Sequence, residues 1–192
     1  MTGRLLLSLS KLEKRTEHLF DELCSWTPEQ LQFRPSLVSW SALDLIDHLV
    51  LTERAVLATM RSNLSAGYEV TFRDRYRSAI VLGMMALPVR LKVPRSVEYL
   101  LPAQTQPDLQ LFRSSWVHDR SLLTEFVQSL SRADRKQGIF RHPFGGWTTA
   151  SGALLFLHLH LYHHLYQFRR LQETRQRTRG RYGKGPSIVG QA

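Results

Sequence analysis

The sequence has a single cysteine, Cys24, in 192 residues. One cysteine excludes an internal disulfide and a cysteine-rich zinc knuckle, and it fits a reducing cytoplasm, where we expect the protein to act. Long hydrophobic runs are also missing, because no apolar stretch reaches the ~18 residues of a membrane-spanning helix. Residues 1–15 lack the full apolar region and the cleavage site of a secretory signal. We therefore expect neither secretion nor a membrane partner.

Acidic residues are scarce, since 16 Asp and Glu stand against 26 Lys and Arg and leave a net charge of +10. Much of the excess lies in residues 73–95 and in residues 173–192, which hold five basic residues and one acid. A basic surface favours nucleic acid, anionic lipid or acidic small molecules as partners. No zinc-finger or RNP pattern supports nucleic-acid binding, which we rank last. We interpret residues 173–192 as a flexible, solvated tail after one domain, residues 1–172.

Helical periodicity dominates the rest of the chain, whose length and 43% hydrophobic content suit a single globular domain. Ser41 and Asp44 form a capping box, and Thr27 with Pro28 predicts the start of a short helix. No segment alternates in the manner of a strand. Apolar residues recur every three to four positions in four segments, which are predicted helices over about residues 3–25, 41–65, 108–130 and 149–172.

The segment between the second and third long helices, residues 68–107, is the least regular. It has the pattern of a short helix up to about Met85, followed by prolines that exclude a long continuous helix, namely Pro88, Pro94, Pro102 and Pro107. We interpret it as a crossover packed on the outside of the molecule. The sequence therefore predicts an all-α fold, a four-helix bundle with one long crossover between the second and third long helices.

Histidines are the most informative residues of the fourth helix. At about 100° per residue, His160 and His164 lie ~40° apart on the apolar stripe and point into the core. His158 lies ~160° from His160 and is expected to face outward, whereas His163 lies at the edge of the stripe. His48 lies in an otherwise apolar part of the second helix, so it is a candidate third member of the inward group.

Three imidazoles that converge in a bundle form a tripodal metal site with open coordination positions. Each histidine alone has a simpler explanation: His48 as an ordinary core histidine, and His160 with His164 as a polar network. Burying all three without a metal leaves many donors and acceptors to satisfy, which is costly. We therefore predict a divalent metal bound by the three histidines. Zinc suits the nitrogen ligands best, and nickel, iron and manganese stay open.

Several short motifs in this order resemble the DinB/YfiT-like superfamily over about residues 27–172. They are Thr27-Pro28-Glu29-Gln30-Leu31, Arg34-Pro35, Trp40-Ser41, Asp47-His48-Leu49 with Glu53, Lys92-Val93-Pro94, His142-Pro143-Phe144-Gly145-Gly146-Trp147-Thr148, and His160, His164 and Gln167. The resemblance implies an antiparallel four-helix bundle, homodimers and a divalent metal on His48, His160 and His164. It also implies the activities of relatives, which are thiol-dependent transferases and isomerases that use mycothiol, bacillithiol or glutathione.

The chain departs from the family at Leu161, where many members carry a glutamate. No general base is therefore available there, and the catalytic residues stay unknown. Glu53 matches the family but lies ~140° around the helix from His48, so we do not expect it to be a ligand. Gln167 is a candidate for contact with a ligand or the substrate. Asp119 either orients a ligating histidine or is a helix-edge residue.

These features predict a metal-dependent enzyme that acts on a small-molecule substrate, a thiol S-transferase or a related hydrolase or isomerase. A low-molecular-weight thiol would be its cosubstrate. Whether the protein is an enzyme stays open, because no general acid or base accompanies the histidines. The first alternative is a non-catalytic module for metal binding or dimerisation, and the second is a basic nucleic-acid-binding protein.

Overall fold

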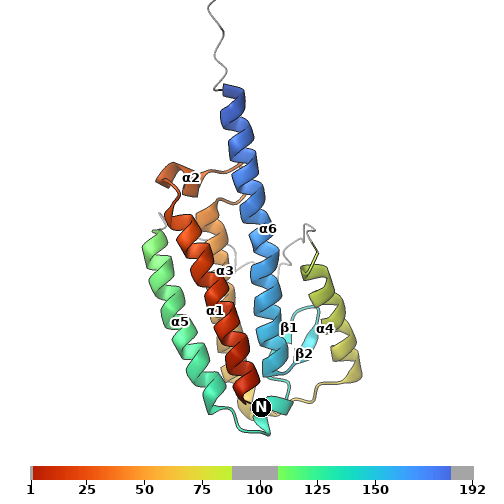
Figure 1. Ribbon diagram of the computed structural model, residues 1–192. Helices are drawn as coiled ribbons and strands as arrows, with labels where there is room; N and C mark the ends of the chain where they lie inside the picture. Colours follow the sequence, from red (N-terminus) through yellow and green to blue (C-terminus); the bar gives the residue numbers. More distant parts are fainter. Residues whose placement is uncertain (1, 88–107, 183–192) are drawn as a thin grey trace, which may run out of the picture.

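The computed structural model describes residues 2–87 and 108–182 and confirms the all-α prediction (Figure 1). Four long helices lie side by side: α1 (Thr2–Cys24), α3 (Ala42–Asn63), α5 (Leu109–Ser129) and α6 (Ala150–Tyr182). The smaller elements are α2 (Pro28–Gln32), α4 (Phe72–Met85), the 3-10 turns η1 (Leu64–Ala66) and η3 (Asp134–Lys136), and the strands β1 (Phe140–His142) and β2 (Gly146–Thr148). None of the described helices combines the length and the hydrophobicity needed to span a bilayer.

The order of the long helices around the bundle explains the crossover. Helices α1 and α3 each pack against both α5 and α6. Figure 1 shows α1 and α6 running in one direction and α3 and α5 in the other. Because α3 and α5 are consecutive among the long helices and run parallel, the connection between them must return along the whole bundle. The resemblance implies an antiparallel bundle. The bundle is antiparallel only in part, since α3–α5 and α1–α6 are parallel pairs.

Capping residues start the helices where the sequence predicts them. The Thr27 side chain caps α2, and Ser41 with Asp44 forms the capping box that starts α3. Asp44 Oδ2 accepts from the Ser41 backbone N–H at 2.7 Å, and Asp44 Oδ1 accepts from Arg34 at 2.9 Å. This double use of Asp44 fixes the entry into α3, a few residues before His48. A third capping box, Thr71 with Asp74, starts α4.

A small hairpin replaces the loop predicted before α6. Strands β1 and β2 pair antiparallel, with Arg141 opposite Trp147. The Trp147 backbone N–H donates to Asp74 of α4 at 3.2 Å. Gly146 has φ +74°, and a Cβ there would lie 2.1 Å from Asp74 Oδ1, so this position requires glycine. Strands of three residues are too short to show alternation in a sequence, which is why this element was missed.

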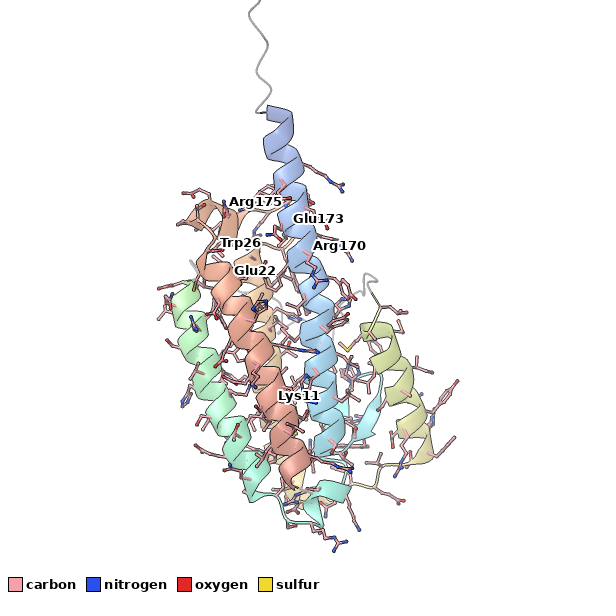
Figure 2. The ribbon with its side chains drawn as sticks, viewed as in Figure 1. Lys11, Glu22, Trp26, Arg170, Glu173 and Arg175 are labelled. Carbon is pink, nitrogen blue, oxygen red and sulfur yellow. The ribbon has the colours of Figure 1, made fainter. Side chains whose placement is uncertain are left out.

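The end of the last helix differs from the prediction. Helix α6 extends past the predicted end near Gln172 to Tyr182, and the Arg175 guanidinium lies 5.2 Å from the ring centroid of the buried Trp26 (Figure 2). This cation–π contact ties the helix extension to the residue just after α1. The four prolines predicted to shape the crossover and the end of the predicted tail, residues 183–192, lie outside the described residues.

Candidate metal centre

The structure brings together the three histidines that the sequence singles out. His48 projects from α3, and His160 and His164 project from consecutive turns of α6. All three side chains are buried. The His160 Nε2 lies 3.2 Å from the Nε2 of His48 and 3.2 Å from the Nε2 of His164. One nitrogen of each ring therefore faces a common centre.

These distances fit a single metal ion. Nitrogens bound to zinc at about 2.0–2.1 Å with tetrahedral angles are about 3.3 Å apart. Two of the three nitrogen pairs match this value. Within residues 2–87 and 108–182, these histidines form the one group of three or more His, Cys, Asp or Glu whose ligand atoms all lie within 4.8 Å of one another. The donor set and its spacing thus suit a divalent cation.

Two aromatic side chains hold the imidazoles in place. The ring of Trp40 packs against His48 at a centroid distance of 5.0 Å and stacks over His164 at 6.3 Å. On the other side, Phe156 stacks on His160 at 5.4 Å. Trp40 directly precedes the capping residue of α3, so the box that starts the helix also places this ring. Trp40 belongs to one of the motifs that carry the family resemblance, but its sequence position alone indicates no role in the site.

The environment keeps two of the three clustered imidazoles uncharged. Burial, and then the neighbouring imidazoles, hold the pKa values of His160 and His164 well below the usual histidine range. His164 Nδ1 lies 3.1 Å from Gln167 Oε1, which only accepts hydrogen bonds. The proton of His164 is therefore on Nδ1, and the Nε2 lone pair points into the cluster. A neutral imidazole whose lone pair is on Nε2 can ligate a metal ion through that atom.

The other two histidines of α6 are less exposed than predicted. His163, expected at the edge of the stripe, is buried, and its Nε2 lies 3.5 Å from Gln167 Nε2. His158, expected to face outward, instead contacts α1 through Ser8, at 2.9 Å from the backbone oxygen and 3.1 Å from Oγ. Helix α6 packs against α1, α3 and α4 at once, so the side opposite the cluster is covered too.

The acidic candidates lie elsewhere in the bundle. The Asp119 carboxylate accepts two hydrogen bonds from Arg54, at 2.8 and 3.1 Å, so its described contacts join α5 to α3 and do not reach a histidine of the cluster. The Glu53 carboxylate is bound by Arg120 and by Trp116, in line with the expectation that it is not a ligand. Leu161 is buried at the position where relatives carry glutamate.

A groove of about 1160 Å³ opens beside the cluster, between α3, α4, α6 and the hairpin. Its volume is ample for a small-molecule ligand. All three histidines line it, together with mostly apolar side chains. Its charged lining residues are four arginines and one acid, namely Arg77, Arg141, Arg170, Arg177 and Glu173. The groove therefore disfavours cationic ligands.

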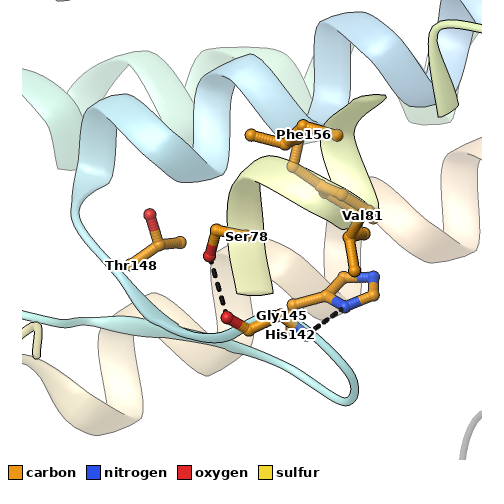
Figure 3. A pocket seen from close by; sticks show the side chains of 7 residues that line it. Ser78, Val81, His142, Gly145, Thr148 and Phe156 are labelled. Atoms are coloured by element: carbon orange, nitrogen blue, oxygen red, sulfur yellow. Dashed lines mark hydrogen bonds between the residues drawn. The ribbon is translucent and has the colours of Figure 1, made fainter. Parts of the chain in front are cut away.

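His142 is a groove residue to which sequence reasoning gave no role. Its Nδ1 accepts hydrogen bonds from the backbone N–H groups of Phe144, at 3.2 Å, and Gly145, at 3.1 Å. Figure 3 shows the bond from Gly145. Burial lowers its pKa to about 4, so the ring is neutral near pH 7. Helix α4 supports this turn, because Ser78 Oγ donates to the Gly145 carbonyl at 2.9 Å. Only the family motif drew attention to this residue.

Comparison with known proteins gives one family. The model of the DinB superfamily matches residues 8–168, which is most of the chain and includes the whole histidine cluster. No significant match is found among curated proteins or among solved structures.

Proposed function

The chain belongs to the DinB superfamily, and we propose that it is an enzyme whose His48, His160 and His164 hold a divalent metal beside a substrate groove. The observation that carries this proposal is the convergence of three buried imidazole nitrogens on one wall of the groove. Three protein ligands leave coordination positions open, which is typical of catalytic metal sites rather than closed structural ones. The open side would then face the groove.

The protein's own residues suit the activation of a weak acid. When bound, a divalent metal would lower the pKa of a thiol or a water in the groove, so that its anion is available near neutral pH. All three imidazoles are neutral ligands, so they add no negative charge that would oppose such an anion. Trp40 and Phe156 cover the rings and limit access of bulk water. Zinc is our first choice, with nickel, iron and manganese as the alternatives.

The reaction we propose is transfer of a low-molecular-weight thiol to a small electrophile. The sulfur forms a bond to an electrophilic carbon, the leaving group departs with the bonding electrons, and the thiol proton passes to solvent. The thiol-dependent activities implied by the family resemblance support this choice. A hydrolase or an isomerase would use the same site with water or an isomerisable substrate.

Gln167 has a supporting role in this proposal. Its Oε1 accepts from His164 Nδ1, while its Nε2 lies within 3.5 Å of His163 Nε2. The amide is thereby held between two imidazoles and keeps the lone pair of His164 directed at the cluster. Groups of this kind orient a ligand and raise its affinity for metal.

Metal content and thiol-adduct formation test the proposal together. Protein purified without a histidine tag should hold about one metal ion per chain, and His48→Ala should hold none. His118, an exposed histidine on α5, provides the matched control, because His118→Ala should retain the metal. Adduct formation between a thiol such as glutathione and 1-chloro-2,4-dinitrobenzene should stop when a chelator removes the metal. Equal rates with and without the chelator would remove the metal from the mechanism.

A non-catalytic metal-binding module is the second candidate, and the buried Leu161 favours it, because an apolar side chain stands where relatives have an acid. Thermal melting during a metal titration separates the two candidates. A large metal-dependent rise in melting temperature, with no ligand position that exchanges with added thiol or azide, would favour the structural role.

Three further predictions belong to this proposal. A homodimer is implied by the family resemblance and is checked by analytical ultracentrifugation. A cytoplasmic location follows from the scarcity of cysteine and is checked by cell fractionation. Nucleic-acid binding by the basic C-terminal residues ranks last, and it would require steep salt dependence that is lost when residues 175–192 are deleted.

A further inference from the structure

His142 binds the hairpin turn through one ring nitrogen, and its side chain lines the groove. The turn after β1 folds back so that the backbone N–H groups of Phe144 and Gly145 both donate to its Nδ1. The bond from Gly145 is drawn in Figure 3. An imidazole nitrogen that accepts hydrogen bonds carries a lone pair and no proton. In the neutral ring the proton must then be on Nε2. The turn therefore fixes His142 as a donor at its free end.

The surroundings of the ring prevent a change of this state. The pKa of about 4 that burial imposes keeps His142 neutral at physiological pH. Aromatic rings surround it, with centroids at 5.1 Å for Phe156, 6.3 Å for Phe144 and 6.5 Å for Phe140. Among the described residues, no hydrogen bond engages the Nε2 of His142. A polar N–H in an apolar wall is costly unless a ligand or water accepts from it.

The position of His142 relates it to the metal centre. His142 and the three clustered histidines line the same groove. Phe156 separates His142 from His160, with its ring 5.1 Å from the former and 5.4 Å from the latter. The two imidazoles thus lie within the length of one small molecule. Helix α4 holds the hairpin in place through Asp74 and Ser78, so the donor is on a supported element and not on a free loop.

We propose that His142 is a substrate-binding residue whose Nε2–H donates a hydrogen bond to a carbonyl oxygen of the molecule held in the groove. This inference rests on the proposed function, because it takes the groove as the substrate site. A neutral donor among aromatic rings matches an uncharged acceptor better than a carboxylate, which a guanidinium would bind more strongly. The substrate class is therefore a small carbonyl compound with an apolar body. Donation to the carbonyl oxygen also withdraws electron density from the carbon that a nucleophile attacks.

Two substitutions of His142 test the roles of its two ring nitrogens independently. His142→Asn retains an acceptor for the backbone N–H groups of the turn, as asparagine does in Asx turns, and has no group at the position of Nε2. His142→Gln extends an amide N–H toward that position and gives up the short acceptor. His118→Asn, at an exposed site, is the matched control.

The probes are 4-oxopentanoate and pentanoate, which have equal length and differ by one carbonyl. Their dissociation constants are measured by NMR titration of the zinc-loaded protein. Wild type and His118→Asn should bind the oxo acid about 5-fold more tightly, as expected for one net hydrogen bond. His142→Asn should bind both acids equally, with the affinity for pentanoate unchanged, and His142→Gln should regain part of the preference. Equal affinities in wild type, or a preference that survives in His142→Asn, would overturn the proposal.

A second readout does not depend on metal. Long-range ¹H–¹⁵N NMR of the zinc-free protein should show His142 as the Nε2–H tautomer, and cyclohexanone should shift its Nε2 resonance while methylcyclohexane does not. An Nδ1–H tautomer would overturn the role of His142 even if zinc binds as proposed. Failure of the chain to bind zinc, with the tautomer and the ketone response intact, would refute the metal centre and leave His142 as a carbonyl-binding residue.

Discussion

Helix α3 carries two buried polar sites that differ in the kind of groups they bring together, since one pairs opposite charges and the other gathers imidazole nitrogens. On one face Glu53 is bound by Arg120 through two contacts of 2.6 Å and by Trp116 at 2.8 Å. About 140° around the helix, His48 directs its Nε2 toward the Nε2 atoms of two other imidazoles. The first site pairs the Glu53 carboxylate with the Arg120 guanidinium, which also lies 3.5 Å from Glu13, whereas the second is a set of imidazole nitrogens facing one another.

The difference separates a structural site from the candidate binding site. The ion pair between α3 and α5 is closed, because each Glu53 oxygen already accepts a hydrogen bond from a buried donor. The histidine cluster lines a groove, and the lone pairs of its rings have a centre on which a cation would sit. Burial alone does not identify function in this bundle. What marks the histidine cluster as the candidate site is the convergence of three imidazole nitrogens beside an opening.

Replacement of His160 should have the largest effect on the histidine side of this comparison. His160 lies between the other two nitrogens, at 3.2 Å from each, so His160→Ala removes the ligand that connects them. We expect metal binding to fall by at least about 100-fold, since a ligand matters more than the groups that orient it. Isothermal titration with zinc measures the change. The Glu53–Arg120 site should be unaffected, so the metal-free variant should melt close to metal-free wild type.

Breaking the Glu53–Arg120 ion pair should reduce stability and leave zinc binding unchanged, which is the reverse of the effect expected for His160→Ala. Glu53→Ala leaves the Arg120 guanidinium buried without its main partner, and loss of one member of a buried ion pair costs about 3–5 kcal/mol. Urea unfolding of the metal-free protein measures this loss, and zinc affinity should stay unchanged. Asp21 provides the control, because it pairs with Arg113 at the surface, where removal of one partner costs about 1 kcal/mol or less. Weaker zinc binding in Glu53→Ala would mean that the two sites are coupled.

Replacement of Gln167, whose amide contacts His164, should weaken zinc binding less than replacement of a ligating histidine. Gln167→Ala removes the acceptor for His164 Nδ1, and we expect zinc affinity to fall about 10- to 100-fold. Gln167→Glu keeps an acceptor at this position and should restore most of the affinity. Competition against a zinc-binding dye measures both variants. If alanine and glutamate variants lose affinity equally, the hydrogen bond is not the reason for the effect.

The sequence predicted the parts of this comparison that depend on helix periodicity. Spacing of four residues placed His160 and His164 on one inward stripe, and the angle between His48 and Glu53 placed the acid away from the cluster. The capping motifs at Thr27 and Ser41 also predicted helix starts correctly, because a cap depends on residues three positions apart. Local geometry of this kind can be read from one segment at a time.

Features that depend on packing between distant segments were missed. The contact of His158 with Ser8 requires knowing that α1 covers the second face of α6. The partner of Asp119, Arg54, lies 65 positions away in the chain, and nothing in either segment indicates the pair. The donor state of His142 depends on a turn and on the α4 side chains that support it. The groove itself is formed by four elements and is not encoded in any one of them.

The pH dependence of stability should report the smallest effect in the series, and it should come from His142. Its pKa is about 4 in the folded protein and 6.5 in the unfolded chain, so between these values the unfolded state binds the proton and the folded state does not. Its contribution to stability is therefore complete above pH 6.5 and is lost as the pH falls toward 4. His142→Asn removes this loss and keeps the turn. Between pH 7 and pH 5, wild type should lose about 1 kcal/mol more stability than His142→Asn in urea unfolding, a value reduced for the partial exposure of the ring. Equal losses of stability in the two proteins would show that His142 is protonated as easily in the folded state as in the unfolded chain. The fold would then not hold His142 as a neutral donor beside the histidine cluster.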